Sequence, residues 1–250
     1  MRISVNPTVV VPTYNEAENV QPMVEALLAL GLPGLEVLVV DDDSPDGTGR
    51  HADRLADRHR GQVHVLHRKG QPGLGRAYLD GFRWALGHGA ETVVQMDCDF
   101  SHAPRDVPRL LAHLPEYDVV VGSRYTEGGR IDEDWEPGRG FLSWWANLYA
   151  RTILGSAVRD FTAGFKAWRR ETLEALDLNA IRSQGYVFQI EMAYVAERLG
   201  FRILETPIYF EDRRIGASKM TMPVKAEAAL GVWRIWWRHH RLRPGDRQPV

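Results

Sequence analysis

Short apolar runs rich in β-branched residues alternate with longer amphipathic segments along the first half of the chain. Alternation of this kind is typical of βαβ units, whose strands form a mostly parallel sheet with helices packed on it. We expect strands at residues 9–11, 35–40, 63–66, 92–96 and 118–121, and helices at residues 18–30, 49–60, 74–88 and 105–114. The pattern therefore predicts an α/β fold.

The pattern changes after Arg124. Residues 127–134 are rich in glycine and charge and show no period, which predicts a mobile loop over the functional site. Beyond that loop we expect helices at residues 141–154, 188–200 and 222–240, and strands at residues 164–168 and 202–210. We assign residues 1–220 to one α/β domain and residues 221–250 to a basic, Trp-rich tail.

Three polar clusters stand where predicted strands end. They are Pro12-Thr13-Tyr14-Asn15-Glu16, the run from Asp41 to Thr48, and Asp97-Cys98-Asp99. Because ligands of open α/β sheets bind at the carboxyl ends of the strands, we expect these clusters to form one site. Two aspartates one residue apart offer hard oxygen ligands for Mg²⁺ or Mn²⁺ that carries a diphosphate. The successive aspartates at residues 41–43 repel one another, which favours a cation or sugar hydroxyls that share their charge.

Each cluster also has a purely structural interpretation. Asn15 could cap a helix, residues 44–47 could form a turn, and Asp-x-Asp is common in solvated loops. Gly73-Leu74-Gly75 opens a predicted helix, but it lacks the third glycine of a dinucleotide-binding fingerprint and follows the third strand. It is therefore either a phosphate-binding loop near Lys69 or a glycine-rich turn.

Composition narrows the class of protein. Hydrophobic residues at 44% and charged residues at 26% are ordinary for a globular domain and exclude disorder. Cys98 is the single cysteine, which excludes an intrachain disulfide, and a thiol between two aspartates is not activated as a nucleophile. The chain shows no signal sequence and no apolar stretch near the roughly 20 residues of a membrane span. We therefore expect it not to cross a bilayer.

Charge and aromatic residues concentrate toward the end of the chain. Residues 211–250 hold nine Lys or Arg against four Asp or Glu, although the whole chain has a net charge of −2. A helical projection gives one arc with Leu230, Val232, Trp233, Trp236 and Trp237 and an opposing arc with Arg234, Arg238 and Arg241. Tryptophan with arginine favours a helix in a membrane interface, and the alternative is a helix packed on the domain.

A second aromatic stripe lies earlier in the chain. Phe141, Trp144, Trp145 and Leu148 are spaced by three and four residues. Such a stripe usually belongs to the core. The alternative interpretation is a groove for a lipid chain.

Seven motifs in order resemble the polyprenol-phosphate (dolichol-phosphate) mannose synthases, which are inverting family 2 glycosyltransferases of the GT-A fold. The motifs are residues 12–16, 40–48, 97–102, 122–125, 160–165 and 212–219, together with Gly73-Leu74-Gly75 and Ala77-Tyr78. The resemblance covers about residues 7 to 220. It implies a GT-A-type, Rossmann-like, mostly parallel sheet flanked by helices, followed by a C-terminal amphipathic helix.

The resemblance also implies roles for individual residues. Pro12, Tyr14, Glu16 and Asp43 would seat the guanosine of the donor with Asp42 close by, while Asp97 and Asp99 would hold Mg²⁺ or Mn²⁺ and the diphosphate. Arg124, Arg139 and Arg213, with Ser143, would bind the acceptor phosphate, and Lys219 would bind the donor. Asp99 and the three arginines are the expected catalytic residues. Some relatives place a glutamine ligand where this chain has Ser101, so water would complete the metal shell here.

The chemistry of such a transfer agrees with these residues. A lipid monophosphate is already an anion near neutral pH, so its attack needs no general base. It needs cations that hold two anionic reactants together, and arginine forks bind phosphate bidentately. We expect mannose transfer from GDP-mannose to a polyprenyl monophosphate, at the cytoplasmic face of the membrane, with or without a separate membrane-anchor protein.

Three rival interpretations remain open. The first is the same chemistry with a UDP-sugar, because the base-contacting residues accept more than one base. The second is a nucleic-acid-binding protein that uses the basic tail, but the chain has no recognised nucleic-acid module and we expect no nucleic-acid partner. The third is a non-catalytic sensor of nucleotide sugars, which would not need the three arginines.

Overall fold

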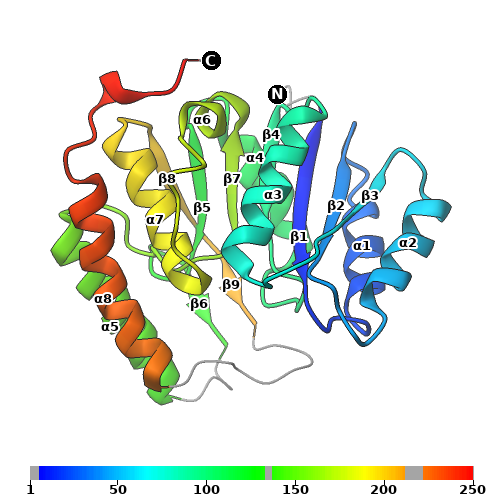
Figure 1. The fold of residues 1–250 in the computed structure, drawn as a ribbon, viewed down its shortest axis with the longest axis horizontal. Helices are drawn as coiled ribbons and strands as arrows, with labels where there is room; N and C mark the ends of the chain where they lie inside the picture. The colour runs from blue at the N-terminus through cyan, green and yellow to red at the C-terminus, as the bar shows by residue number, and fades with distance from the viewer. Residues whose placement is uncertain (1–5, 133–136, 212–221, 250) are drawn as a thin grey trace.

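A seven-stranded sheet with the order β3-β2-β1-β4-β7-β5-β8 forms the centre of the molecule (Figure 1). This computed structural model describes residues 6–132, 137–211 and 222–249. The strands are β1 (Pro7–Thr13), β2 (Glu36–Asp41), β3 (Val63–His67), β4 (Thr92–Gln95), β5 (Val119–Ser123), β7 (Lys166–Arg169) and β8 (Ile203–Pro207). β7 runs antiparallel to β4 and β5, and the other neighbouring pairs are parallel. The predicted α/β fold with a mostly parallel sheet is confirmed.

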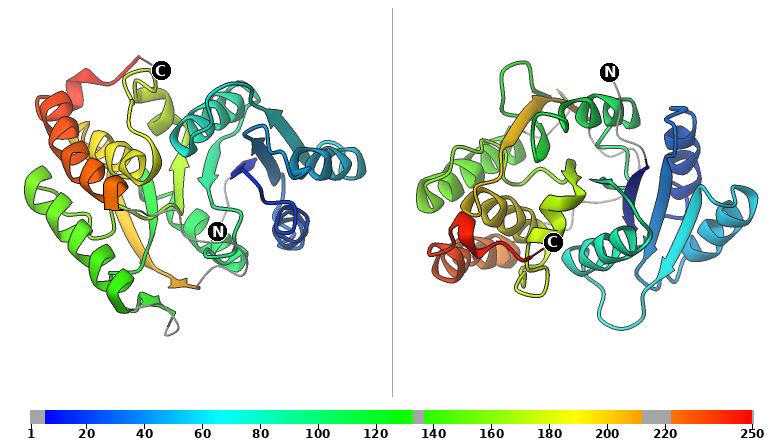
Figure 2. Two further views of the ribbon diagram at one scale, coloured as in Figure 1. Left: turned by 60° about the horizontal axis from the view of Figure 1, so that its bottom comes forward. Right: turned by 90° about the horizontal axis from the view of Figure 1, so that it is seen from above.

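Helices cover both faces of this sheet (Figure 2). The helices are α1 (Val20–Leu28), α2 (Thr48–Arg58), α3 (Leu74–Gly87), α4 (Val107–His113), α5 (Pro137–Leu154), α6 (Arg170–Ala175), α7 (Gly185–Arg198) and α8 (Met222–His239), with short 3₁₀ turns η1 (Pro104–Asp106) and η2 (Pro244–Asp246). Side chains of α1, α2 and α4 form one core with the sheet, and side chains of α3, α6 and α7 form the other.

Strand β1 illustrates why the apolar runs are continuous. Val9 and Val11 point into the core under α1, whereas Val10 points into the core under α3. All three side chains are fully buried. Successive side chains of a strand alternate between faces, so a strand covered on both sides is apolar at every position.

A third apolar cluster joins α5, α7 and α8. Its buried members include Ala150 and Leu154 of α5, Tyr194 of α7, and Val232 and Ile235 of α8. The tail predicted as a separate unit therefore contains a helix that packs on the domain, as Figure 1 also shows for α5 and α8. Along the described chain, no helix is long and apolar enough to cross a membrane.

One local prediction was wrong, and one structural alternative is excluded. Within the segment predicted to be a loop without secondary structure, Arg130–Ile131 forms β6 and pairs with β9 (Tyr209–Phe210) in a small second sheet. Residues 133 and 134 of that segment lie outside the described chain. Asn15 does not start a helix, because its φ of 59° is left-handed and α1 begins at Val20. Helix α6 was not predicted, since it is too short to show a helical period.

Candidate active site

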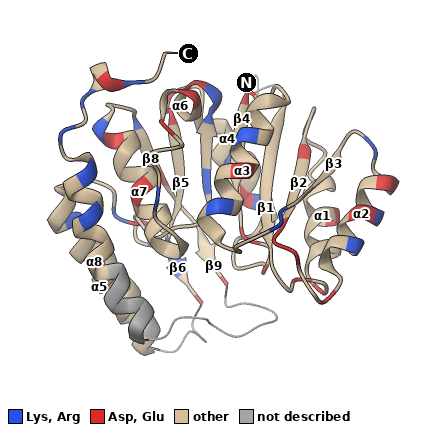
Figure 3. Ribbon diagram, viewed as in Figure 1, with Lys and Arg blue, Asp and Glu red and all other residues tan. Residues whose placement is uncertain are grey.

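The polar loops after β1 and β2 are tied together by hydrogen bonds. The backbone N–H of Asn15 donates to Ser44 Oγ at 3.1 Å, that of Glu16 to Thr48 Oγ1 at 2.9 Å, and that of Ala17 to Asp46 Oδ2 at 3.1 Å. β2, β1 and β4 are neighbours in the sheet, so the clusters that follow them share one edge. Figure 3 shows acidic residues in the loops beyond the lower ends of β1 and β2. The prediction that these clusters gather at one edge is confirmed.

The successive aspartates are balanced by groups of the protein itself. Asp42 is paired with Arg68 and accepts the backbone N–H of Gly73 at 2.8 Å. The carboxylate of Asp41 accepts the Ser44 hydroxyl at 2.6 Å. A bound cation or sugar is therefore not needed to explain the charge of these two aspartates, contrary to the argument from sequence. Asp43 differs from them, because it is exposed and has a left-handed φ of 56°.

Asp97 and Asp99 follow β4 and are each oriented by one neighbour. The hydroxyl of Tyr78, on α3, donates to Asp97 Oδ1 at 2.9 Å. Ser101 donates to Asp99 Oδ1 through its hydroxyl at 2.6 Å and through its backbone N–H at 3.1 Å. Ser101 thus positions a carboxylate. Burial is the largest effect on the Tyr78 hydroxyl and raises its pKa well above the ordinary value, so it stays a donor.

Groups packed around Asp97 leave little space on its inner side. A Cβ at Gly164 would lie 3.0 Å from Asp97 Oδ2 and 3.3 Å from the ring of His102, so this position favours glycine. Burial lowers the pKa of His102, although Asp97 and Asp99 oppose this, and the ring stays neutral near pH 7. Burial also raises the pKa of the Cys98 thiol well above its usual range, which agrees with an unreactive cysteine.

Arg124 forms a buried ion pair with Asp160. Its Nε and Nη2 donate to the two oxygens of Asp160 at 2.8 and 2.6 Å, its backbone N–H donates at 2.9 Å, and Nη2 also donates to Thr162 at 2.6 Å. The Arg124 and Asp160 side chains are 8% and 0% exposed. Burial alone would lower the pKa of Arg124, but the Asp160 charge outweighs it and raises that pKa above its ordinary value. This geometry supports a positioning role for Arg124; the predicted phosphate contact stays a prediction.

The structure describes some of the other predicted site residues and not others. Ser143 lies beside the Tyr125 hydroxyl. Burial raises the pKa of that hydroxyl, although the Arg124 charge opposes the shift. Arg213 and Lys219 lie outside the described residues, and the side chain of Arg139, on α5, is also outside the description. Tyr14 exposes 39% of its surface at the same edge as Asp43, and Pro12 is buried near the end of β1.

One lysine lies buried beneath this edge. Lys166 of β7 is 0% exposed and donates to the Ala163 carbonyl and, at 3.0 Å, to Gln189 Oε1. Burial is the largest effect on this side chain and lowers its pKa to about 7, although Asp160 opposes the shift. Lys166 therefore holds the segment that places Gly164 against Asp97.

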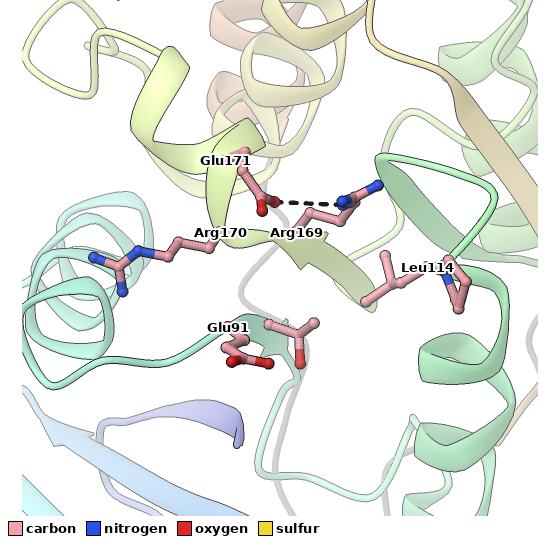
Figure 4. A pocket seen from close by; sticks show the side chains of 7 residues that line it. Glu91, Leu114, Arg169, Arg170 and Glu171 are labelled. Carbon is pink, nitrogen blue, oxygen red and sulfur yellow. Dashed lines mark hydrogen bonds and ion pairs between the residues drawn. The ribbon is translucent and has the colours of Figure 1, made fainter. Parts of the chain in front are cut away.

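A cavity of about 440 Å³ lies at the opposite edge of the sheet (Figure 4). It is lined by Glu91, Thr92, Leu114, Pro115, Arg169, Arg170 and Glu171. Arg169 pairs with Glu171, and Arg170 pairs with Glu174. Its two arginines are paired within the protein, and it lies at the amino end of β4, away from Asp97. We do not assign the donor to it.

The fold and this site agree with known proteins. A family model described as Glycosyl transferase family 2 matches residues 8–177. The chain belongs to glycosyl transferase family 2.

Two relatives within family 2 align along nearly the whole chain. Undecaprenyl-phosphate mannosyltransferase of Micrococcus luteus is 46% identical over 241 residues, which are 94% of this chain and 98% of that protein. Polyprenol monophosphomannose synthase of Mycolicibacterium smegmatis is 45% identical over 238 residues, covering 94% of this chain and 89% of that protein. The resemblance inferred from the seven motifs is confirmed.

A solved structure supports the fold. Glucosyl-3-phosphoglycerate synthase from Mycobacterium tuberculosis, crystallised with Mn²⁺, UDP-glucose and phosphoglyceric acid, superposes with a TM-score of 0.69. Its sequence identity is 20%, and the match covers 93% of this chain and 80% of that one. At this identity the likeness shows the fold alone, and it agrees with a GT-A-type transferase.

Sequence reasoning quoted Tyr78, Asp160, Thr162 and Gly164 within motifs but gave them no role. In the structure Tyr78 and Gly164 contact Asp97, and Asp160 and Thr162 bind Arg124. Their position inside short polar or glycine-containing motifs was the available signal. The hydrogen-bonded partners are 19 to 38 residues apart in sequence, so spacing could not pair them.

Proposed function

We propose that this protein transfers mannose from GDP-mannose to a polyprenyl monophosphate, with inversion at the anomeric carbon. The observation that carries the proposal is the near-full-length identity to two proteins named for mannose transfer to undecaprenyl or polyprenol phosphate. The geometry at the carboxyl edge of the sheet supports a nucleotide-sugar donor. A UDP-sugar is the second candidate, because UDP-glucose occupies the structurally similar synthase.

The donor diphosphate is placed at Asp97 and Asp99. Across the described residues, no group of three or more His, Cys, Asp or Glu could hold a metal by itself. Mg²⁺ is typically held by one or two carboxylates, with substrate phosphates and water as its other ligands, and Mn²⁺ also accepts oxygen ligands. The two aspartates fit this donor set. A bound Mg²⁺ or Mn²⁺ would supply Lewis-acid stabilisation of the departing GDP.

The guanosine is placed over the loops that follow β1 and β2. Tyr14 offers a partly exposed ring on the loop after β1, and Asp43 is exposed on the loop after β2. The two loops are joined because the Ser44 and Thr48 hydroxyls accept backbone N–H groups of the first loop. Glu16 belongs to the same loop. Asp42 shapes this site through Arg68 and Gly73, since its carboxylate already binds both.

The acceptor attacks without a protein base. A lipid monophosphate is ionised near neutral pH. The buried titratable groups close to Asp97 are engaged within the protein: His102 Nδ1 accepts the backbone N–H of Asp97 at 3.5 Å, and Asp160 is ion-paired with Arg124. We assign the acceptor phosphate to Arg139, Arg213 and Ser143, with Lys219 on the donor side, and we assign Arg124 to holding the segment around Asp160.

The lipid acceptor requires contact with a membrane surface, for which the structure offers an aromatic surface on two adjacent helices. We define this aromatic surface as Phe141, Trp144, Trp145 and Leu148 of α5 with Leu230, Trp233 and Trp237 of α8, each at least 43% exposed. The stripe on α5 is therefore not core. On α8, Val232 and Ile235 pack inward and Arg234 is exposed next to Trp233, while the exposed Arg241 follows the end of the helix. Tryptophan beside arginine suits the bilayer interface.

We place the protein at the cytoplasmic face of the membrane, as a peripheral protein. A GDP-linked donor and a single cysteine, which forms no intrachain disulfide, are the features that suit this side. A membrane-anchor protein would be an additional partner. The membrane arrangement rests on the aromatic surface and on the chemistry of the acceptor.

One assay tests the proposed function. Purified protein is incubated with Mg²⁺ or Mn²⁺, radiolabelled GDP-mannose, GDP-glucose, UDP-glucose or UDP-galactose, and polyprenyl phosphate, and label is measured in the lipid extract. We expect label from GDP-mannose alone. Label from a UDP-sugar only would replace the donor assignment, and no label with any donor would refute the proposed function.

A second assay tests the membrane arrangement. Trp144→Ser with Trp237→Ser removes apolar area from the aromatic surface without opening the core, because both side chains are close to half exposed or more. We expect the wild type to float with anionic vesicles in low salt and the double variant to stay at the bottom of the gradient. Activity of the double variant on a short, detergent-dispersed acceptor should be retained. Equal flotation of the two proteins would contradict the arrangement.

A further inference from the structure

Glu191 lies at the junction of α7, α8 and the loop before α7. Its side chain is 0% exposed and each of its oxygens serves a different element. Oε1 accepts Arg238 and, at 2.8 Å, His239 Nε2, both from α8. Oε2 accepts the backbone N–H groups of Arg182 at 3.0 Å and Ser183 at 2.8 Å. One buried carboxylate thus fixes the C-terminal helix and the loop together.

The loop held by Glu191 packs on the glycine segment next to the donor loops. A Cβ at Gly75 would lie 2.8 Å from the Ser183 carbonyl oxygen, and one at Gly73 would lie 2.7 Å from Gln184 Oε1. The N–H of Gly73 in turn donates to Asp42 at 2.8 Å. A shift of the loop therefore moves Gly73 and the hydrogen bond that it makes to Asp42.

A second contact leads from α7 to the metal-binding aspartates. Phe188, one turn before Glu191, stacks on Tyr78 with ring centroids 5.8 Å apart and an interplanar angle of 3°. The Tyr78 hydroxyl donates to Asp97. The position of α7 therefore affects both sides of the candidate donor site through packed, hydrogen-bonded side chains, which is the physical basis that coupling between sites requires.

We propose that Glu191 is a positioning residue that joins the C-terminal helix to the donor site, so that the seating of α8 sets the affinity for the nucleoside diphosphate. This inference rests on the proposed function for the identity of the ligand. Since α8 also carries half of the aromatic surface, the same carboxylate links the membrane-facing helix to the donor loops.

The test compares three variants. Glu191→Gln keeps the shape of the side chain but removes its charge, and its amide cannot accept all four donors. Arg238→Gln removes one contact to α8 and leaves the two loop bonds. Glu197→Gln is the matched control, because Glu197 lies on the same helix and binds the N–H of Ala157 at 3.1 Å, away from the loop.

The first readout is binding of GDP with Mn²⁺, measured by titration calorimetry, which needs neither acceptor nor turnover. We expect Glu191→Gln to weaken GDP binding at least fivefold, Arg238→Gln to weaken it by a smaller factor, and Glu197→Gln to change it less than twofold. In steady-state assays the KM for the donor should rise with Glu191→Gln, while the KM for polyprenyl phosphate stays within twofold. A general loss of folded protein would lower kcat and leave the KM values for the donor and for polyprenyl phosphate unchanged.

The second readout is hydrogen exchange at the amides of Arg182, Ser183 and Gly73. Exchange reports local opening and does not depend on any ligand. We expect exchange at all three positions to accelerate at least tenfold in Glu191→Gln and not in Glu197→Gln. The proposal is overturned if Glu191→Gln binds GDP like the wild type, or if the control has the same effect. If the wild type binds neither GDP nor UDP, the proposed function fails. Faster hydrogen exchange at the Gly73 amide in Glu191→Gln then shows by itself whether Glu191 joins α8 to the donor loops, and unchanged exchange there overturns the proposal.

Discussion

Replacing Arg124 by methionine is expected to lower the free energy of unfolding of the protein, in addition to any effect on catalysis. The guanidinium of Arg124 makes three hydrogen bonds, two to Asp160 and one to Thr162, and the Asp160 side chain is fully buried. Removing one partner of a buried ion pair leaves an uncompensated charge and costs roughly 3–5 kcal/mol. For a domain of this size, each kcal/mol lowers Tm by roughly 2–4 °C, so we expect a fall of about 6–20 °C.

The assays are thermal unfolding and urea unfolding, both followed by circular dichroism in the absence of donor and metal. Arg60→Met is the control, because Arg60 pairs with Asp57 at 3.7 Å on the surface and its side chain is 85% exposed. A surface pair of this kind contributes roughly 0–1 kcal/mol. Asp160→Asn keeps an acceptor for the backbone N–H of Arg124 and completes a double-mutant cycle, in which we expect a coupling energy of about 1–3 kcal/mol.

A different result would refute this reasoning. If Arg124→Met unfolds at the same urea concentration as the wild type but loses transfer activity, the ion pair with Asp160 contributes little to stability. Arg124 would then act by contacting a phosphate, as the sequence resemblance implies. Additive effects of the two substitutions would lead to the same conclusion.

Three further predictions follow from the contacts of single side chains. Asp97→Ala should abolish transfer while leaving the protein folded, and a wild type that stays active in EDTA would contradict the metal site. Ser101→Ala removes the 2.6 Å hydrogen bond to Asp99, worth about 1 kcal/mol, so Mn²⁺ affinity measured by calorimetry should fall roughly fivefold. Burial raises the pKa of Glu191, but hydrogen bonds from His239 and Ser183 outweigh it and lower that pKa from 4.5 to about 2. The ionised Glu191 side chain therefore contributes its full stabilisation above pH 4.5. As pH falls from 4.5 toward 2, about 3 kcal/mol should be lost, and Glu191→Gln should flatten this dependence in acid unfolding curves.

Local pattern was sufficient for the elements of the first half of the chain. Strands β1 to β5 and helices α1 to α4 fall where the apolar runs and helical periods predict them, because both faces of the sheet are covered. The gathering of the polar clusters was also predictable, since carboxyl ends of parallel strands share one edge. Asp97 and Asp99 could be singled out as candidate metal ligands from residue type and spacing. The direction of β7 was not predictable, because the residues of a single strand do not show whether it pairs parallel or antiparallel.

The sequence by itself determined the fold class, the edge of the sheet at which the polar clusters gather, and the family. Only the tertiary structure decided which charges are already paired: Arg124 with Asp160, 36 residues later, and Glu191 with Arg238, 47 residues later. It also decided that α8 packs through Val232 and Ile235 while Trp237 stays exposed. The physical reason is that periodicity reports which face of an element is apolar, whereas the partner of a buried charge depends on how distant elements pack together.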